Sequence, residues 1–335
     1  MTIHPASRIT NHESRITNHV LVTGGAGFIG SHLVERLLAD GKSVVVVDDL
    51  STGRLENLQA VRAHPKLRVI ESRISSCPEL GELVTQAEVI YHLAAAVGVE
   101  LVVRSPIHVL ETNLHETEVL LKAAAGQGVP VLLTSTSEVY GKSQKEAFGE
   151  EDNLLIGPPH QVRWSYACSK LMDEFLAMAY AKERALPVII TRLFNTVGPR
   201  QTGQYGMVLP RFIAAARSGQ PLRVYGDGRQ TRCFCYVLDT VEALVRLQGC
   251  VAARGQVFNV GSTEEISIRD LARKVIESLR SESAIELVPY SQAYEPGFDD
   301  MRRRKPVVEK LDGTVGFRPR TGLQTIIELT AGALT

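Results

Sequence analysis

A glycine-rich segment near the start of the chain, VLVTGGAGFIG at residues 20–30, constrains the fold more than any other feature. Its apolar first half predicts a buried parallel strand, and the residues after Gly30 have the apolar spacing of a helix. The glycines between them allow a tight turn and a close approach of the backbone to a pyrophosphate. The first turn of the helix then offers free N–H groups to phosphate oxygens. We therefore predict a dinucleotide-binding unit whose contacts come from Gly24, Gly27, Phe28, Ile29 and Gly30.

A second apolar run identifies the dinucleotide. Residues 43–48, SVVVVD, predict the next parallel strand, and this strand ends in Asp48, 18 residues beyond Gly30. A carboxylate at this distance can bind the adenosine ribose hydroxyls and repel a 2′-phosphate. A solvated Asp beside an unrelated glycine-rich turn is the alternative, and the complete strand–turn–helix–strand context argues against it. The sequence therefore favours NAD over NADP.

A tyrosine and a lysine lie four residues apart in YACSK, residues 166–170, which places both on one face of a helix. An ammonium beside a phenol, with a cationic nicotinamide nearby, favours the phenolate and is expected to lower the tyrosine pKa. Such a tyrosine takes the proton of a hydroxyl while a hydride leaves the same carbon. An ordinary amphipathic pair is the alternative for YxxxK taken alone. The dinucleotide-binding unit in the same half of the chain favours the catalytic interpretation.

Composition narrows the possible partners. The 335 residues hold 37 Lys and Arg against 37 Asp and Glu, so no overall charge points to nucleic acid or to an anionic membrane. The five cysteines lack a disulfide-framework spacing, and Cys233 and Cys235 have no second ligand pair, which predicts that these two are buried thiols. We therefore expect no metal site and a reducing, cytoplasmic setting. The polar hexamer SRITNH occurs at both 7–12 and 14–19. It is neither a signal peptide nor a membrane span, and we expect residues 1–19 to be a disordered leader.

Strand and helix patterns alternate from residue 20 to about 193, which predicts an α/β fold with a doubly wound parallel (Rossmann) sheet. Strands are expected at 20–23, 44–47, 67–70, 89–93, 131–134 and 188–193, with long helices at 106–125 and 165–182. After residue 195 turns become frequent, and 257–260 reads as a strand that returns to the sheet. We divide the chain into an NAD-binding domain at 20–195, with the return strand near 235–260, and an interwoven substrate-binding part at 196–234 and 261–335.

From residue 20 to about 330 the chain resembles the extended short-chain dehydrogenase/reductase family, specifically its nucleotide-sugar epimerases, dehydratases and decarboxylases. The motifs that carry the resemblance are GGAGFIG at 24–30, DDLSTG at 48–53, HLAA at 92–95, Tyr166 with Lys170, RLFNTVGPR at 192–200 and GDGRQTR at 226–232. The resemblance implies NAD as cofactor, a UDP-sugar as substrate and a 4-keto intermediate. It also implies a homodimer whose two long helices bury a stripe around Leu114, Leu121 and Phe175.

The resemblance assigns roles to individual residues. It implies Thr136, Glu138, Tyr166 and Lys170 as catalytic residues. Beyond the glycine turn and Asp48, the expected NAD contacts are Asp49, Ser51, Thr52, Gly53, Leu93, Ala94, Ala95, Asn113, Tyr166 and Lys170. The expected contacts to the nucleotide sugar are Asn195, Arg200, Val224, Gln230, Arg232 and Arg302, although the sequence does not choose among the arginines at 302–304. Ser72-Arg73-Ile74 departs from the Gly-Asp-Ile that often contacts adenine in this family.

The segment TSTSEVYG, residues 134–141, bears on the reaction, because its Glu138 resembles that of the nucleotide-glucuronate decarboxylases. Simple 4-epimerases usually lack this carboxylate, and dehydratases usually carry an Asp-Glu pair. We therefore expect a UDP-glucuronate decarboxylase that makes UDP-xylose, with a UDP-glucose or UDP-glucuronate 4-epimerase as the alternative. A non-catalytic NAD sensor is a third reading, and the intact acid–base set argues against it.

Overall fold

The computed structural model describes residues 18–203, 207–293 and 301–333. The expected leader therefore lies outside the described residues except for its last two positions, and His19 already belongs to the first strand. In the described part of the chain the main sheet has seven parallel strands in the order β3-β2-β1-β4-β5-β6-β11. Their bounds are β1 (His19–Thr23), β2 (Val44–Asp48), β3 (Leu67–Glu71), β4 (Ala87–His92), β5 (Val131–Thr136), β6 (Val188–Leu193) and β11 (Gln256–Val260).

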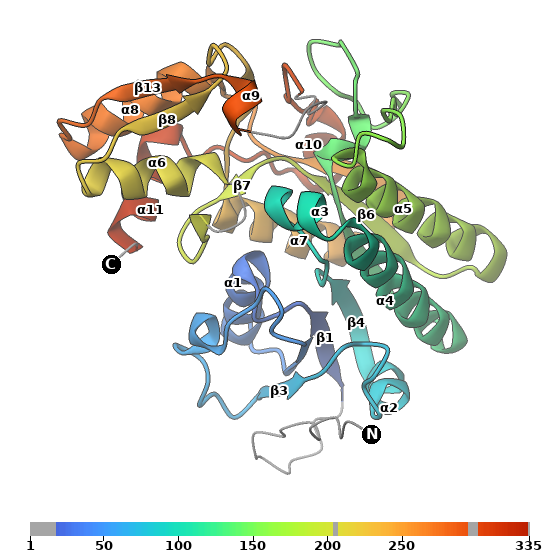
Figure 1. Ribbon diagram of the computed structural model, residues 1–335. Coiled ribbons are helices and arrows are strands. Elements are labelled where there is room, and N and C mark those ends of the chain that lie inside the picture. The colour runs from blue at the N-terminus through green and yellow to red at the C-terminus, as the bar shows by residue number, and fades with distance from the viewer. Residues whose placement is uncertain (1–17, 204–206, 294–300, 334–335) are drawn as a thin grey trace, which may run out of the picture.

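Helices cover both faces of this sheet (Figure 1). On one face lie α1 (Phe28–Ala39), α7 (Val237–Gly249) and α10 (Glu309–Val315), which share a core with Val20 and Val22. On the other lie α2 (Leu80–Thr85), α4 (Pro106–Gln127) and α5 (Trp164–Arg184), which share a core with Leu21 and Val45. Because both faces are covered, the strands are buried on both sides and read as continuous apolar runs in the sequence. The predicted doubly wound fold is confirmed.

The C-terminal half adds a smaller assembly with its own core, at the upper left of Figure 1. It is built from α6 (Val208–Arg217), α8 (Ile268–Leu279), α11 (Leu323–Ala333), and the parallel pair β8 (Leu222–Tyr225) and β13 (Ile285–Val288). The remaining described elements are short: α3 (Val99–Arg104), α9 (Tyr290–Ala293), β7 (Thr196–Val197), β9 (Thr231–Cys233), β10 (Cys235–Tyr236), β12 (Glu265–Ser267), and the 3₁₀ turns η1 (Leu55–Leu58), η2 (Ser137–Tyr140) and η4 (Val251–Ala253). The chain passes from the sheet to this assembly and back through α7 and β11.

Candidate active site

A cavity of about 570 Å³ runs along the carboxyl ends of the parallel strands and into the smaller assembly. Its lining begins at the turn after β1 and at Asp48, passes Tyr166, and reaches Tyr225 and Tyr290. In open α/β sheets ligands bind at this edge, where the strand order reverses, and here β1 lies between β2 and β4. The cavity therefore joins the predicted cofactor residues to the predicted substrate residues in one continuous space.

The glycine turn at one end of the cavity tolerates no side chain. Gly24 has φ +73°, and a Cβ there would lie 2.6 Å from the backbone nitrogen of Ala94. A Cβ on Gly30 would lie 2.1 Å from the carbonyl oxygen of Gly24. All five predicted residues of the turn line the cavity, and the first turn of α1 carries no acidic side chain. The turn and the helix N-terminus therefore fit a pyrophosphate.

Asp48 lines the same end, at the last position of β2. Its carboxylate accepts hydrogen bonds from the backbone N–H groups of Ala26, at 2.8 Å, and Leu50, at 2.9 Å. Burial raises its pKa, and these two donors act against that rise. Gly53 packs on this carboxylate, because a Cβ there would lie 2.8 Å from Oδ1. Asp48 thus closes the glycine turn and also faces the cavity.

Its neighbours complete the adenosine end. Asp49, Ser51 and Thr52 line the cavity, and so does Arg73, whose Nε lies 3.5 Å from Oδ2 of Asp49. The residue that departs from the family pattern is thus held at the cavity wall by an ion pair. The loop after β4 supplies Leu93, Ala94 and Ala95 to the lining. This loop, the glycine turn and Asp48 together fit NAD.

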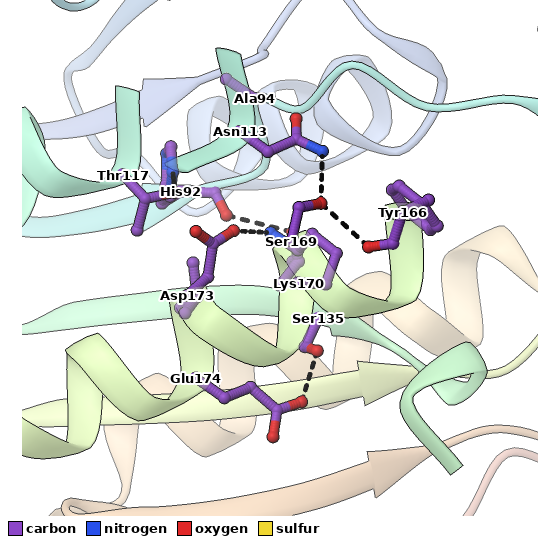
Figure 2. Close-up of polar contacts among 12 residues, drawn as sticks. His92, Ala94, Asn113, Thr117, Ser135, Tyr166, Ser169, Lys170, Asp173 and Glu174 are labelled. Carbon is purple, nitrogen blue, oxygen red and sulfur yellow. Dashed lines mark hydrogen bonds and ion pairs between the residues drawn. The ribbon is translucent and has the colours of Figure 1, made fainter. Parts of the chain in front are cut away.

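Asn113 supports that loop and is not among the lining residues (Figure 2). It is buried on α4, where its Oδ1 accepts from the backbone N–H of Ala96 at 2.7 Å. Its Nδ2 donates to the carbonyl of Ala96 and, at 3.1 Å, to the hydroxyl of Ser169 on α5. Asn113 therefore ties the loop after β4 to the helix that carries Tyr166 and Lys170.

The four predicted catalytic residues all line the middle of the cavity. Thr136 ends β5, two residues beyond the predicted end of that strand, and its hydroxyl accepts from the backbone N–H of Glu138 at 3.2 Å. Tyr166 and Lys170 lie one turn apart on α5, as the spacing predicts. The strand end, the 3₁₀ turn η2 and helix α5 therefore converge on one place.

The surroundings that this chain provides raise the pKa of Tyr166, whereas the lowering expected from the sequence relies on Lys170 together with a cationic nicotinamide. Burial is the largest cause, followed by the negative charges of Glu138 and Asp173, while Arg304 and a hydrogen bond from Thr136 act in the opposite direction. The Lys170 ammonium is itself paired with the Asp173 carboxylate, 2.8 Å away.

Glu138 has a cationic partner that the sequence analysis did not single out. Arg304 Nη1 lies 3.3 Å from Glu138 Oε1, and its Nη2 donates to the Ser137 hydroxyl at 3.1 Å. Both charged side chains are mostly buried and line the cavity. Arg302, the predicted contact, is exposed and does not line the cavity, and Arg303 pairs with Glu265 at 2.7 Å. The basic run at 302–305 therefore supplies one residue to the cavity wall, and only the fold selects its third member.

The predicted substrate residues divide into two groups. Asn195, Arg200, Gln230 and Arg232 line the cavity, whereas Val224 is fully buried in the core of the smaller assembly and its neighbours Arg223 and Tyr225 do the lining. Arg232 donates to the carbonyl of Met301 at 2.8 Å, which holds it beside the segment of Arg304. Arg200 pairs with Glu35 of α1 at 2.5 Å, so it also fastens its loop over the glycine turn.

Within the ranges that the structure describes, no group of three or more His, Cys, Asp and Glu side chains is arranged to hold a metal ion. In the same ranges no helix combines the length and the apolar character that crossing a bilayer requires. All five cysteines are among the described residues and none forms a disulfide there.

Comparison with known proteins identifies the family. Residues 20–261 match the model of the NAD dependent epimerase/dehydratase family. The chain is 42% identical over 300 residues to a UDP-N-acetyl-alpha-D-glucosaminuronate decarboxylase of Bacillus cytotoxicus, covering 89% of this chain and 92% of that protein. It is 37% identical over 309 residues to UDP-glucuronic acid decarboxylase 2 of Arabidopsis thaliana, covering 91% of this chain but 65% of that longer protein.

A solved structure agrees with these relatives. A UDP-glucuronic acid 4-epimerase mutant of Bacillus cereus, in complex with NAD and a fluorinated UDP-sugar, superposes with a TM-score of 0.84 at 28% identity, covering 94% of this chain and 98% of that one. The family match spans the whole Rossmann sheet, and the glycine turn, Asp48 and the Tyr166–Lys170 helix occupy one cavity within it. The chain belongs to the NAD dependent epimerase/dehydratase family of extended short-chain dehydrogenases/reductases.

Proposed function

We propose that this enzyme is an NAD-dependent decarboxylase of a UDP-uronate sugar, with UDP-glucuronate as the substrate and UDP-xylose as the product. The observation that carries the proposal is the Glu138–Arg304 ion pair on the cavity wall beside Tyr166. A cation there can bind the sugar carboxylate, and a carboxylate there can manage a proton. Oxidation at carbon 4 requires neither binding of a sugar carboxylate nor proton transfer at carbon 5, whereas loss of carbon dioxide from carbon 5 uses both.

In the first step Tyr166 removes the proton from the 4-hydroxyl of the sugar, with Thr136 hydrogen bonding to the same group. When bound, NAD accepts the hydride from carbon 4, later returns it, and carries a positive charge in its oxidised form. The N-terminus of α1, Asp48 and Lys170 would hold the cofactor. Because burial raises the pKa of Tyr166, its phenolate depends on nearby positive charges, among which are Arg304 and, in this proposal, Lys170.

In the second step the ketone at carbon 4 lies β to the carboxylate. The bond between carbons 5 and 6 breaks, carbon dioxide leaves, and the electron pair is delocalised as an enolate onto the carbon 4 oxygen. A proton then adds to carbon 5, and Glu138, alone or through water, is placed to handle it. Hydride return to carbon 4, with Tyr166 giving its proton to the oxygen, completes the reaction. The balance is one UDP-uronate and one proton in, one UDP-pentose and one carbon dioxide out.

Two alternatives are supported by specific comparisons. The Bacillus cytotoxicus relative is named for a substrate with an N-acetyl group on the uronate, so UDP-N-acetylglucosaminuronate is a second substrate candidate for the same chemistry. The Bacillus cereus structure is a UDP-glucuronic acid 4-epimerase of the same fold. An epimerase would use Tyr166, Lys170 and Thr136 in the same way and would return the hydride to the opposite face of the ketone.

One experiment separates these possibilities. Purified protein is incubated with UDP-glucuronate, UDP-N-acetylglucosaminuronate and UDP-glucose in parallel, and the products are analysed by mass spectrometry. We expect UDP-glucuronate to lose the mass of one carbon dioxide. Loss of carbon dioxide from the N-acetyl substrate alone would reassign the substrate and keep the reaction. A product of unchanged mass and altered configuration would refute decarboxylation.

The proposal includes a homodimer in the cytoplasm. Helices α4 and α5 pack side by side (Figure 1) and expose Ile107, Leu110, Met172 and Phe175, the last with 64% of its surface accessible. This face can form a four-helix interface with a second copy. Of the stripe expected from the sequence, Leu121 is instead fully buried in the protomer core. Free thiols, including the exposed Cys168, are compatible with a reducing compartment.

A further inference from the structure

Helix α5 carries an ionisable residue, Asp173, beside Lys170. Asp173 has no role in the reaction described above. Lys170 Nζ donates to Oδ2 of Asp173 at 2.8 Å (Figure 2). The two residues are three positions apart and so share one face of the helix. Their side chains are 3% and 0% exposed, so bulk solvent compensates neither charge well. Each charge therefore depends on the other.

On the side of β4 and α4, the groups near the pair are polar but uncharged. His92 of β4 lies between Thr23, whose Oγ1 is 2.7 Å from Nδ1, and Thr117 of α4, whose Oγ1 is 3.0 Å from Nε2. Burial, followed by the charge of Lys170, lowers the pKa of His92 to about 3, so this imidazole is neutral near pH 7. Thr117 also lies beside the Asp173 carboxylate. His92 therefore offers Lys170 no counter-charge.

The charged groups around the pair come from several elements. Besides Lys170, Glu174 of α5 acts on the Asp173 carboxylate, whereas Glu138 of η2 and Arg304 of the C-terminal segment act on Tyr166. Glu138 is paired with Arg304, and Glu174 receives the Arg192 guanidinium at 2.8 Å. Both of these acidic groups are thus already bound to arginines. Asp173 is the carboxylate that remains for Lys170.

A buried ammonium without a counter-ion is destabilised in its charged form and releases its proton more readily. A neutral amine would no longer provide the positive charge that the proposed acid–base set needs beside Tyr166 and the cofactor. The same burial raises the pKa of Asp173, and the Lys170 ammonium acts against that rise.

We propose that Asp173 is a positioning residue, whose carboxylate keeps the Lys170 side chain charged and fixed in orientation at the wall of the catalytic cavity. This inference rests on the proposed role of Lys170 but concerns a property of the folded protein that exists without any substrate. It can therefore be tested even if the proposed reaction is wrong.

The test is a pH titration of the Lys170 side chain by NMR, with the full-length protein labelled with ¹³C at the lysine ε-carbons. The Lys170 resonance is assigned by its disappearance in Lys170→Arg. We expect its titration midpoint to fall by at least one pH unit in Asp173→Asn and to stay within half a unit of wild type in Asp173→Glu. The matched control is Glu174→Gln, which alters the adjacent buried carboxylate and should leave the Lys170 midpoint unchanged.

A midpoint in folded Asp173→Asn equal to that of wild type would overturn the proposal, and so would an equal fall in Glu174→Gln. A second measurement covers the case in which Asp173→Asn folds poorly. If Asp173→Asn folds poorly because the Lys170 ammonium has lost its counter-charge, removing that ammonium should restore stability. The double variant Lys170→Met with Asp173→Asn should then have a higher melting temperature than Asp173→Asn alone. A double variant no more stable than the single one would show that Asp173 acts through packing and would also overturn the proposal.

Discussion

The buried imidazole of His92 should make the stability of the protein depend on pH in a measurable way. The pKa of His92 is lowered from 6.5 to about 3, mainly by burial. In the unfolded chain the same imidazole takes a proton near pH 6.5. Between these two values the unfolded state binds one more proton than the native state, so stability falls as the pH falls. The slope is about 1.36 kcal/mol per pH unit for one group, which amounts to about 2 kcal/mol between pH 6.5 and pH 5.

The substitution His92→Gln removes this titration while keeping a side chain that can hydrogen bond to Thr23 and Thr117. The free energy of unfolding is measured by urea denaturation at pH 7.5 and at pH 5.0. We expect wild type to lose about 2 kcal/mol more between the two pH values than His92→Gln does. His115→Gln, at an exposed position of α4, is the matched control and should lose as much as wild type. Equal losses in wild type and His92→Gln would refute the reasoning.

Three further predictions concern the cofactor site and the oligomer. Gly30→Ala should abolish NAD binding, measured by fluorescence titration, because the new Cβ meets the Gly24 carbonyl. Gly126→Ala, with open space around it, is the control, and unchanged affinity in Gly30→Ala would refute the close fit. Asp48→Asn should weaken NAD binding by about tenfold to a hundredfold, since a hydrogen bond to a charged group contributes about 1.5–3 kcal/mol; full cofactor occupancy would mean that Asp48 does not bind the ribose. Phe175→Glu should be monomeric by light scattering at micromolar concentration, whereas Leu287→Glu, at an exposed position of β13, should remain dimeric. A wild-type protein that is itself monomeric would contradict the proposed dimer.

The sequence predicts the Rossmann sheet well because its strands are buried on both faces. All six strands expected before residue 195 and the return strand at 257–260 are present, with ends that differ by up to two residues. The glycine turn could also be predicted from the sequence, because Gly24 and Gly30 have no room for a side chain and must be glycines. Local sequence determined both features, so reading the sequence locally was sufficient.

The parts that were missed depend on contacts between distant segments. Arg304 meets Glu138 across 166 positions, and no local pattern distinguishes it from Arg302 or Arg303. Asn113, expected at the cofactor, is buried and joins the loop after β4 to α5, a contact between segments that no local pattern indicates. Asp173 lies only three residues from Lys170, yet its importance arises from complete burial, which the amphipathic pattern of α5 does not predict.

The most direct test of the proposed chemistry is the rate of carbon dioxide release from UDP-glucuronate by wild type and by Glu138→Gln. The substitution keeps the size of the side chain and removes the charge that proton handling at carbon 5 requires. We expect the rate to fall by about 10²–10⁴-fold, while NAD remains bound because the glycine turn and Asp48 are unchanged. Glu146→Gln, at a residue whose side chain is 95% exposed, should release carbon dioxide at the wild-type rate. Wild-type protein that converts UDP-glucuronate to its 4-epimer without loss of carbon dioxide, with Glu138→Gln nearly as fast, would contradict the decarboxylase assignment.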